Sequence, residues 1–437
     1  MKISILAAGA GGMYCGSCLR DSAIAHALRN AGHEVTLIPL YSPLKTERDM
    51  TSGEVFYGGV NIYLQHASQV FRKTPRVLDW VFDRPWLLKV AGQYGATSDP
   101  AALGDLTIEI LKAEDGSAAK ELDRLVEFLR DSVKPDVICV PNLMFVGAAR
   151  ELRERVGVPV VCELAGEDTF LDKLKPQDQA SVRSIIRERA KGVDRFVSVT
   201  KYYAARSAEY LGVDEGAIDV VYTGLSPEYF APPAANGQKR PLTIGFFGRQ
   251  CAEKGLGLLV DAVTSLRGRP NMWDVRLKVA GYVSPKDAKW LAALKKRAAA
   301  AGMSDRIDWM GEVSLDQKIG LLDSIDVFSM PTTVPEPTGH SIFEALARGV
   351  PVVQPRHGSF PEIVQMTGGG VLVKPNDADA LADGIVELFY DDHRRKAMGR
   401  KAQQIVAERF TERRMAYDML GVFENLIDKQ ARQYAAV

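Results

Sequence analysis

The sequence has few cysteines, no excess of charge and no long apolar run, and each absence excludes a class of protein. Lys and Arg together number 55, as do Asp and Glu, so no net positive charge attracts a nucleic-acid backbone. No apolar run approaches the roughly 18 residues of a membrane-spanning helix. The apolar run at the start ends at glycines and is too short for a secretory signal. We expect a cytoplasmic protein that binds no nucleic acid.

The 5 cysteines are odd in number and sparse for 437 residues, so they do not indicate a disulfide framework. Cys15 and Cys18 have the spacing of a redox motif or of half a zinc site. No second pair of cysteines or histidines accompanies them in the sequence. We favour small residues that line an acceptor pocket, Ser17 among them.

What is present is a repeating alternation of short apolar runs with helical periodicity. This pattern is typical of parallel sheets covered by helices on both faces. Apolar residues make up 46% of the chain, and its length suits two domains. We predict an α/β protein with two Rossmann-like, doubly wound parallel-sheet domains and an interdomain cleft at the carboxyl ends of the strands. The expected strands are Lys2–Ala7, Val35–Pro39, Pro135–Val140, Val158–Cys162, Arg195–Val199, Leu242–Phe247, Val275–Ala280, Arg306–Trp309, Val327–Met330, Val350–Gln354 and Val371–Val373.

Two irregular segments interrupt this alternation. Residues 231–241, rich in Pro, Ala and Gly, predict a linker, so we expect an N-terminal domain over 1–230 and a C-terminal domain over 231–411. Val70–Val90 interleaves basic residues with aromatic ones. We interpret it as a lid on the first domain; contact with an anionic membrane surface is the alternative.

A glycine-rich loop, Gly9–Gly12, follows the first expected strand. Such a loop lets the backbone approach a phosphate at a helix N-terminus, although many α/β proteins use it for packing alone. A dinucleotide site would also need an acidic residue at the end of the second strand. The chain has Leu37–Leu40 there, which argues against a dehydrogenase.

A second loop follows the strand expected at Leu242–Phe247. Gly248 and Arg249 begin it, and Lys254 follows shortly before a predicted helix. A guanidinium and an ammonium group a few residues apart suit the two phosphates of a nucleoside diphosphate. The alternative is that both are solvated loop charges.

The most informative stretch runs from Glu336 to Glu344, between a predicted strand and a predicted helix. One acid then lies on the loop and the other in the first turns of the helix, where carboxylates can accept hydrogen bonds from sugar hydroxyl groups. Backbone N–H groups near Gly339–Ser341 would point at phosphates. The alternative is an acidic helix start that only offsets the helix dipole.

Taken together, these motifs resemble the retaining glycosyltransferases of family 4, in glycosyl transferase group 1, which have the GT-B fold. The resemblance covers nearly the whole chain and is strongest in the second half. The motifs in order are Gly11-Gly12, Gly32–Val35, Thr223–Leu225 with Phe230, Gly248-Arg249, Glu253–Gly255, the Glu336 and Glu344 pair, Ala345–Val353, and Gly358 with Pro361-Glu362.

The resemblance implies a role for each matched position. Arg249 and Lys254 would hold the diphosphate, Glu336 would contact the transferred sugar, and Glu344 would bind the ribose. It also implies a chain that needs no metal, because the two cations replace one, and a terminal helix (about 412–437) that crosses back onto the first domain. Further donor-binding candidates are Gly12, Gly248, Gly311, Val313, Gly339, His340 and Ser341. His340 departs from the family, in which an aliphatic residue is common there, and the alternative is a structural residue of the helix start.

One departure from the family concerns the sugar side of the site. Many relatives have a His-Gly pair after the strand expected at Val158–Cys162, and this chain has Ala165 at the histidine position. Glu167 or Asp168 would then serve the sugar or the acceptor. Tyr14 and Ser17 complete the acceptor-side candidates.

The predicted function is metal-independent, retaining transfer from a UDP- or GDP-sugar to a hydroxyl group. The acceptor would be a small molecule, a glycan or a lipid-linked molecule. The alternatives are a GT-B-fold sugar-nucleotide isomerase, epimerase or hydrolase, and a donor-binding protein without catalysis.

Overall fold

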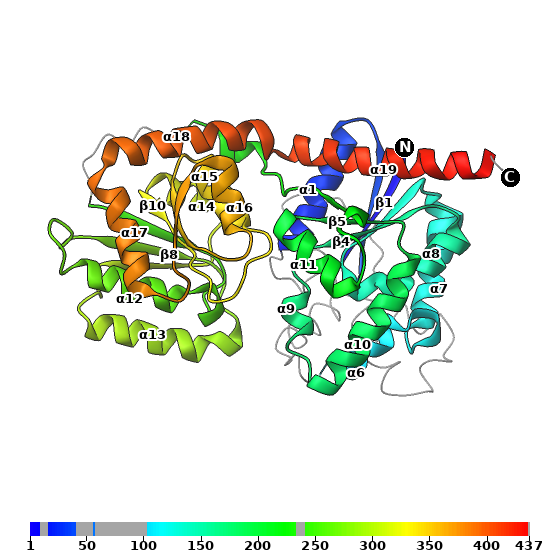
Figure 1. Ribbon diagram of the computed structural model, residues 1–437, viewed down its shortest axis with the longest axis horizontal. Helices are drawn as coiled ribbons and strands as arrows, with labels where there is room; N and C mark the ends of the chain where they lie inside the picture. The colour runs from blue at the N-terminus through cyan, green and yellow to red at the C-terminus, as the bar shows by residue number, and fades with distance from the viewer. Residues whose placement is uncertain (9–15, 41–55, 57–102, 233–240, 436–437) are drawn as a thin grey trace. The chain divides into compact units, whose positions relative to one another are not determined.

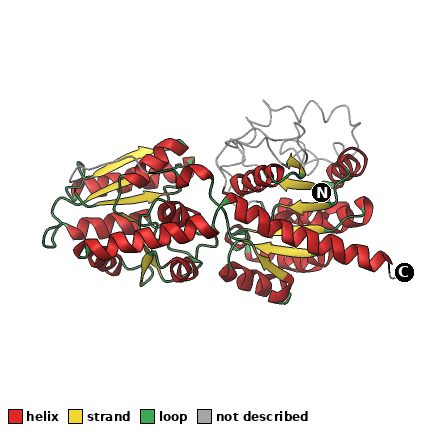
Figure 2. Cartoon of the chain, turned by 90° about the horizontal axis from the view of Figure 1, so that it is seen from above, coloured by secondary structure: helices red, strands yellow, loops and turns green. Residues whose placement is uncertain are grey.

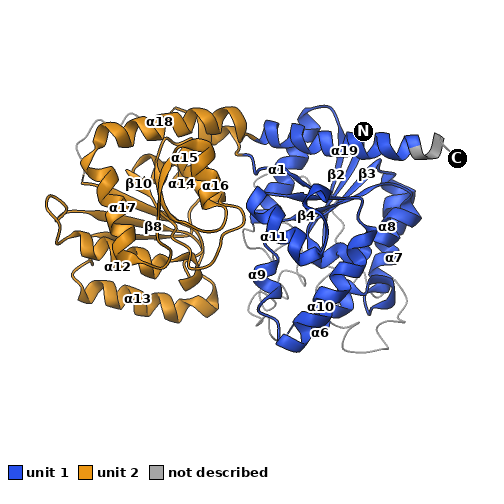
Figure 3. Cartoon of the chain, viewed as in Figure 1, with its two compact units in different colours: residues 1–224, 412–437 blue, residues 225–411 orange. Residues whose placement is uncertain are grey.

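Two parallel sheets organise the chain, one in each of two units (Figure 1). The computed structural model describes residues 1–8, 16–40, 56, 103–232 and 241–435. Unit 1 comprises Met1–Gly224 with Glu412–Val437, and unit 2 comprises Leu225–Thr411 (Figure 3). Unit 2 begins earlier than the expected boundary at 230 and 231, and the side chain of Tyr229 is hydrogen bonded to Glu344 of the same unit. Within each unit, helices cover the strands on both sides (Figure 2).

The described strands of unit 1 form a 6-stranded parallel sheet in the order β2-β1-β3-β4-β5-β6. They are β1 (Lys2–Ala7), β2 (Glu34–Pro39), β3 (Val137–Val140), β4 (Val160–Leu164), β5 (Arg195–Ser198) and β6 (Ile218–Val220). The helices are α1 (Gly16–Asn30), α6 (Gly104–Leu111), α7 (Ala119–Glu127), α8 (Ala149–Val156), α9 (Asp168–Leu171), α10 (Pro176–Arg189), α11 (Lys201–Leu211) and α19 (Glu412–Ala435). The short edge strand β6 was not predicted, and β4 lies later than the expected Val158–Cys162.

Both faces of the unit 1 sheet are apolar, which explains why its strands are continuous apolar runs. Successive side chains of a strand point to opposite faces. Ile3 and Ile5 therefore pack in one core cluster with residues of α1 and α19, whereas Leu6 packs in another with residues of α7, α8 and α10. Helices thus cover the sheet on both sides, as predicted for a doubly wound sheet.

The last helix, α19, contributes one face to the core of unit 1. Its buried side chains recur at helical spacing and pack with those of α1 and of the sheet. Its other face is polar, and no helix among the described residues is long and apolar enough to cross a bilayer. The buried residues are Met415, Ala416, Met419, Val422, Phe423 and Leu426.

Unit 2 repeats the architecture with a 6-stranded parallel sheet in the order β12-β11-β10-β7-β8-β9. Its strands are β7 (Thr243–Phe247), β8 (Arg276–Ala280), β9 (Ile307–Gly311), β10 (Val327–Phe328), β11 (Val352–Pro355) and β12 (Gly370–Val373). Its helices are α12 (Leu256–Leu266), α13 (Ala288–Ala300), α14 (Leu315–Asp323), α15 (His340–Ala347), α16 (Phe360–Thr367), α17 (Ala378–Tyr390) and α18 (Asp392–Arg409). The order of the strands reverses between β7 and β10. Open sheets of this kind bind ligands at the carboxyl ends of the strands at such a switch point.

Candidate active site

The loop after β7 is fixed against the loop after β10. It passes through a 3-10 turn, η8 (Ala252–Lys254), and enters α12 at Gly255 with a φ of 74°. A side chain at Gly255 would collide with the carbonyl group of Pro331, so only glycine fits there. The backbone N–H of Thr333 also donates to the carbonyl of Glu253, at 2.9 Å. These contacts hold Lys254 beside the residues that follow β10.

Lys254 and Glu336 form a partly buried ion pair at this switch point. The ammonium Nζ of Lys254 lies 2.6 Å from Oε2 of Glu336, and the hydroxyl of Thr338 donates to Oε1 at 3.0 Å. Burial alone would raise the pKa of the Glu336 carboxyl, but the charge of Lys254 and these hydrogen bonds outweigh it and lower that pKa. An ionised acid and a cation thus meet where sequence reasoning expected the donor diphosphate and sugar.

Helix α15 begins directly after this pair and offers donors to an anion. Gly339 precedes it with a φ of 64°, and its carbonyl accepts from the N–H groups of Ile342 and Phe343 at 3.0 and 3.3 Å. Among the described residues, no acceptor contacts the N–H groups of His340 and Ser341, and Nδ1 of His340 is buried without a partner. Unsatisfied donors at the positive end of a helix suit a phosphate.

Glu344 lies one turn further along α15. The residue is only 1% exposed. Its Oε1 is contacted by the hydroxyl of Tyr229 at 2.5 Å, by Nζ of Lys318 at 2.7 Å and by Nε2 of His340 at 3.4 Å. Burial would raise the pKa of this carboxyl, but Lys318 and His340 outweigh it and hold the pKa well below its ordinary value. The carboxylate therefore stays ionised and oriented.

Sequence reasoning missed Lys318 and Tyr229. Lys318 comes from α14, and Tyr229 from the 3-10 turn η7 (Pro227–Phe230). Lys318 had one signal in the sequence. It lies three and four residues before Leu321 and Leu322, which are buried, so it shares the inward face of its helix. Tyr229 had no such signal.

Arg249, the other expected phosphate ligand, points to its own loop. Its Nη2 lies 3.1 Å from Oε2 of Glu253, and its Nε lies 3.3 Å from the sulfur of Cys251. Among the described residues it contacts neither Lys254 nor Glu336. It follows the same strand as Lys254, but within the described ranges no acceptor contacts both cations.

The remaining donor-side candidates lie at the same edge of the sheet. Gly248 lies against the sulfur of Met330, which also accepts from the hydroxyl of Ser341 at 3.6 Å, so Gly248 and Ser341 share a neighbour. Gly311 ends β9, and its carbonyl accepts from Gly281 at 2.7 Å. Val313 follows just before α14. Neither Gly311 nor Val313 contacts the Lys254 or Glu344 groups.

The described candidates of unit 1 follow β4. Glu167 accepts from the N–H groups of Ala165 and Gly166, both at 3.1 Å, and from the hydroxyl of Tyr203 at 3.0 Å. Burial raises the pKa of its carboxyl despite these hydrogen bonds. Asp168 accepts from Tyr203 at 3.1 Å and from Nε of Arg206 at 2.5 Å.

The other acceptor-side candidates divide between described and undescribed residues. Ser17 lies in the first turn of α1, whereas Gly12, Tyr14 and the proposed lid Val70–Val90 lie outside the described residues.

Metal ligands and disulfides are absent from the described part of the chain. No three His, Cys, Asp or Glu side chains there gather into a group that could hold a metal ion. The cysteines that the structure describes are buried and form no disulfide, and Cys15 lies outside the described residues. Cys18 is a buried residue of α1. The interpretation of the Cys15 and Cys18 pair stays a prediction.

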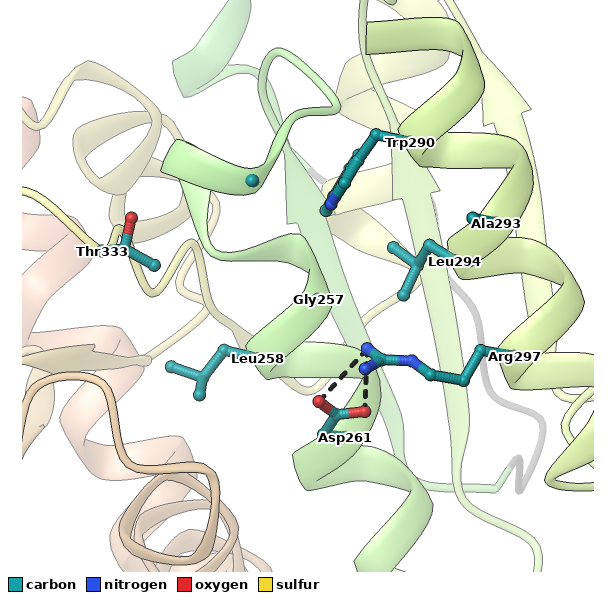
Figure 4. Close-up of a pocket in the computed structure, with 9 residues that line it drawn as sticks. Gly257, Leu258, Asp261, Trp290, Ala293, Leu294, Arg297 and Thr333 are labelled. Atoms are coloured by element: carbon teal, nitrogen blue, oxygen red, sulfur yellow. Dashed lines mark hydrogen bonds and ion pairs between the residues drawn. The ribbon is translucent and has the colours of Figure 1, made fainter.

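A separate cavity of about 450 Å³ lies between α12 and α13 (Figure 4). Arg297 reaches from α13 to Asp261 of α12, with 3.0 Å between Nη2 and Oδ1. Because these two are the only charged residues of the lining, the cavity has no unpaired cation for a phosphate. The candidate site is therefore the β7 and β10 edge. The lining residues are Ala252, Gly257, Leu258, Asp261, Trp290, Ala293, Leu294, Arg297 and Thr333.

Family models match both halves of the chain. The model described as glycosyl transferases group 1 matches residues 231–405, and the model described as glycosyl transferase 4-like domain matches residues 22–224. The chain belongs to the group 1 glycosyl transferases. The family predicted from the motifs is thus confirmed.

Two curated proteins are similar to about half of this chain. A GDP-mannose-dependent alpha-(1-6)-phosphatidylinositol monomannoside mannosyltransferase of Mycobacterium tuberculosis is 30% identical over 239 residues, covering 51% of this chain and 60% of that protein. A D-inositol 3-phosphate glycosyltransferase of Corynebacterium urealyticum is 29% identical over 235 residues, or 50% of this chain and 55% of that protein. The matches thus span little more than half the length of these curated relatives.

A crystal structure of Anabaena Alr3699/HepE in complex with UDP and glucose matches with a TM-score of 0.69 and 17% sequence identity. The match covers 98% of this chain and 100% of that chain. Together with the two parallel sheets, it shows the GT-B fold of this group 1 glycosyl transferase, as the sequence predicted.

Proposed function

We propose that this group 1 glycosyl transferase moves a sugar from a UDP- or GDP-sugar to a hydroxyl group of an acceptor. The observation that carries the proposal is the pairing of two buried acids with two lysines around the start of α15. Lys254 meets Glu336 at 2.6 Å, and Lys318 meets Glu344 at 2.7 Å. Both pairs lie at the switch point of the unit 2 sheet.

Each group has a part in the proposed chemistry. Lys254, Arg249 and the N–H groups at the start of α15 bind the diphosphate and stabilise the charge that develops on it. Glu344 accepts hydrogen bonds from the ribose, and Glu336 contacts the transferred sugar. The bond between the anomeric carbon and the phosphate oxygen breaks, and a bond from that carbon to the acceptor oxygen forms. The acceptor proton passes to the departing phosphate.

Two finer features belong to the same proposal. Because lysine and arginine offset the phosphate charge, the reaction proceeds without a divalent metal. Because the departing phosphate takes the proton, the acceptor attacks from the face that the nucleotide leaves, and the anomeric configuration is retained. The interdomain cleft expected from the sequence stays a prediction.

The test is a panel of UDP-, GDP- and ADP-sugars with acceptors of several classes. The relatives above act on inositol phosphate and phosphatidylinositol mannoside by their names, so these acceptors join simple glycans in the panel. We expect one donor to release its nucleotide faster with one acceptor class, with EDTA present and absent. Release of no nucleotide from any donor, or conversion of the sugar nucleotide without release, contradicts the proposal.

A further inference from the structure

The contacts of Glu344 fall on one of its two carboxylate oxygens. Tyr229, Lys318 and His340 all meet Oε1, at 2.5, 2.7 and 3.4 Å. None of these contacts uses Oε2. A carboxylate held by one oxygen has a fixed plane, and its second oxygen is presented in a fixed direction.

The hydroxyl of Tyr229 is rigidly placed. The tyrosine is 4% exposed, and the carbonyls of Tyr229 and Ala231 accept from Nη1 of Arg348 at 3.0 and 2.5 Å. Arg348 is itself held by both oxygens of Asp323, at 2.7 and 2.9 Å. The backbone around Tyr229 is therefore fastened to α15 and α14, the two helices that also supply Glu344 and Lys318.

Lys318 is confined in the same way. Its Nζ lies 4.7 Å from the ring centre of Phe247 and 5.4 Å from that of Tyr229. Two aromatic faces stabilise a cation and restrict its side chain. Tyr229 thus acts on Glu344 twice, through its hydroxyl and through the ring beside Lys318.

We propose that Tyr229 is a positioning residue for nucleoside recognition: with Lys318 it fixes Glu344 through Oε1, so that Oε2 is aimed at the ribose hydroxyls. This inference rests on the proposed function, since it takes Glu344 as the ribose ligand. It adds a residue that the motifs do not contain. The consequence is specificity for ribose over deoxyribose, because a rotating carboxylate would lose its directed hydrogen bond.

The experiment compares Tyr229→Phe with the unaltered protein by calorimetry, using a ribonucleoside diphosphate and its 2′-deoxy analogue. UDP and GDP are both tried, and the tighter binder is kept. We expect the unaltered protein to prefer the ribonucleotide about tenfold, and Tyr229→Phe to lose most of that preference by weakening ribonucleotide binding alone. In turnover, KM for the donor rises and kcat changes little.

The variant Tyr203→Phe is the matched control, because its hydroxyl also meets a partly buried glutamate, Glu167, at 3.0 Å but in unit 1. We expect it to leave the preference unchanged. A further variant, Lys318→Met, should weaken the same preference, and Lys318→Arg should restore part of it.

The outcomes separate this inference from the proposed function. If the unaltered protein does not distinguish the two sugars, Glu344 is not the ribose ligand and the proposed role of that residue fails. If the unaltered protein distinguishes them and Tyr229→Phe distinguishes them equally well, the positioning role is wrong. Equal weakening of both nucleotides also overturns it, because that result indicates a structural role only.

Discussion

Two glutamates, one in each unit, sit in similar surroundings and behave oppositely. Glu344 and Glu167 each accept a hydrogen bond from a buried tyrosine hydroxyl and each follow a strand of a parallel sheet. The pKa of the Glu344 carboxyl is lowered, whereas burial raises that of Glu167. The difference lies in Lys318 and His340, which contact Glu344, whereas Glu167 accepts from two backbone N–H groups and from Tyr203.

Hydrogen bonds from neutral donors do not prevent burial from raising the pKa of the Glu167 carboxyl. The charges beside Glu344 lower the pKa of its carboxyl despite burial, because a cation offsets the lost hydration of an anion. Glu344 and Lys318 thus form an ion pair within unit 2. Glu167 is instead bound to its own loop, which argues for a role in shaping that loop.

The largest expected effect is a loss of turnover when the two cations of the loop after β7 are removed. Arg249→Ala combined with Lys254→Ala should lower turnover by about a thousandfold or more, because both cations proposed to bind the departing diphosphate are lost. Initial rates of nucleotide release measure it. Lys295→Ala is the matched control, since Lys295 lies over the ring of Trp309 at 5.0 Å on α13. Normal rates in the double variant would move the phosphate site elsewhere.

The next effect compares the two glutamates directly. Glu344→Ala should weaken nucleotide binding by about ten- to a hundredfold, because the proposed hydrogen-bond acceptor for the ribose is removed. Glu167→Ala should leave that affinity unchanged. Calorimetry with UDP or GDP measures both, and circular dichroism checks that each variant is folded. Equal losses of affinity in the two variants would contradict a specific role of Glu344 in nucleotide binding.

A smaller effect is the pH dependence of stability. The raised pKa of Glu167 means that the folded chain keeps a proton that the unfolded chain loses, so the free energy of unfolding falls as pH rises from about 4.5 through the folded pKa. The lowered pKa of Glu344 gives the opposite slope, with stability lost as pH falls below about 4.5.

Urea midpoints across pH test these slopes in Glu167→Gln and Glu344→Gln. The first variant should lose the decline above pH 4.5, and the second should lose the decline below it. If both variants flatten the same side of the profile, the assignment of opposite pKa shifts is incorrect.

The smallest expected effect is that of removing Arg206, a cation of unit 1. Arg206 bonds Asp168 but is 45% exposed, so its ion pair is screened by water. Arg206→Ala should change the free energy of unfolding by less than about 1 kcal/mol. Turnover should stay within about twofold of normal. A loss as large as that of the Arg249→Ala, Lys254→Ala double variant would place Arg206 and Asp168 in the reaction.

The sequence predicted those parts of the fold that have a strong local signal. The apolar runs of both sheets gave the strands, because sheets buried on both faces need continuous apolar segments. The edge strand Ile218–Val220 was not predicted, because it is short and has a polar residue, Asp219, at its centre. The two-residue strand β10 was expected to be longer, although its position was correct.

The same division applies to the site. Glu336, Glu344 and Lys254 could be predicted because a loop after a strand and a helix start place them locally. The inward face of Lys318 had a local signal, but the contacts of Tyr229 and Lys318 with Glu344 could not be predicted, because they span 115 and 26 residues of sequence. No local pattern reports which distant side chain will meet a given oxygen.

The packing of α19 on the sheet of unit 1 has a consequence for how the chain is made. The ribosome releases β1 and α1 long before Met415, Met419 and Phe423, which cover the same core cluster. Until those residues emerge, the apolar side chains of Ile3, Val137 and Val161 lack part of their cover. A nascent chain halted before residue 412 would therefore expose an apolar surface on its first unit, which chaperones can bind.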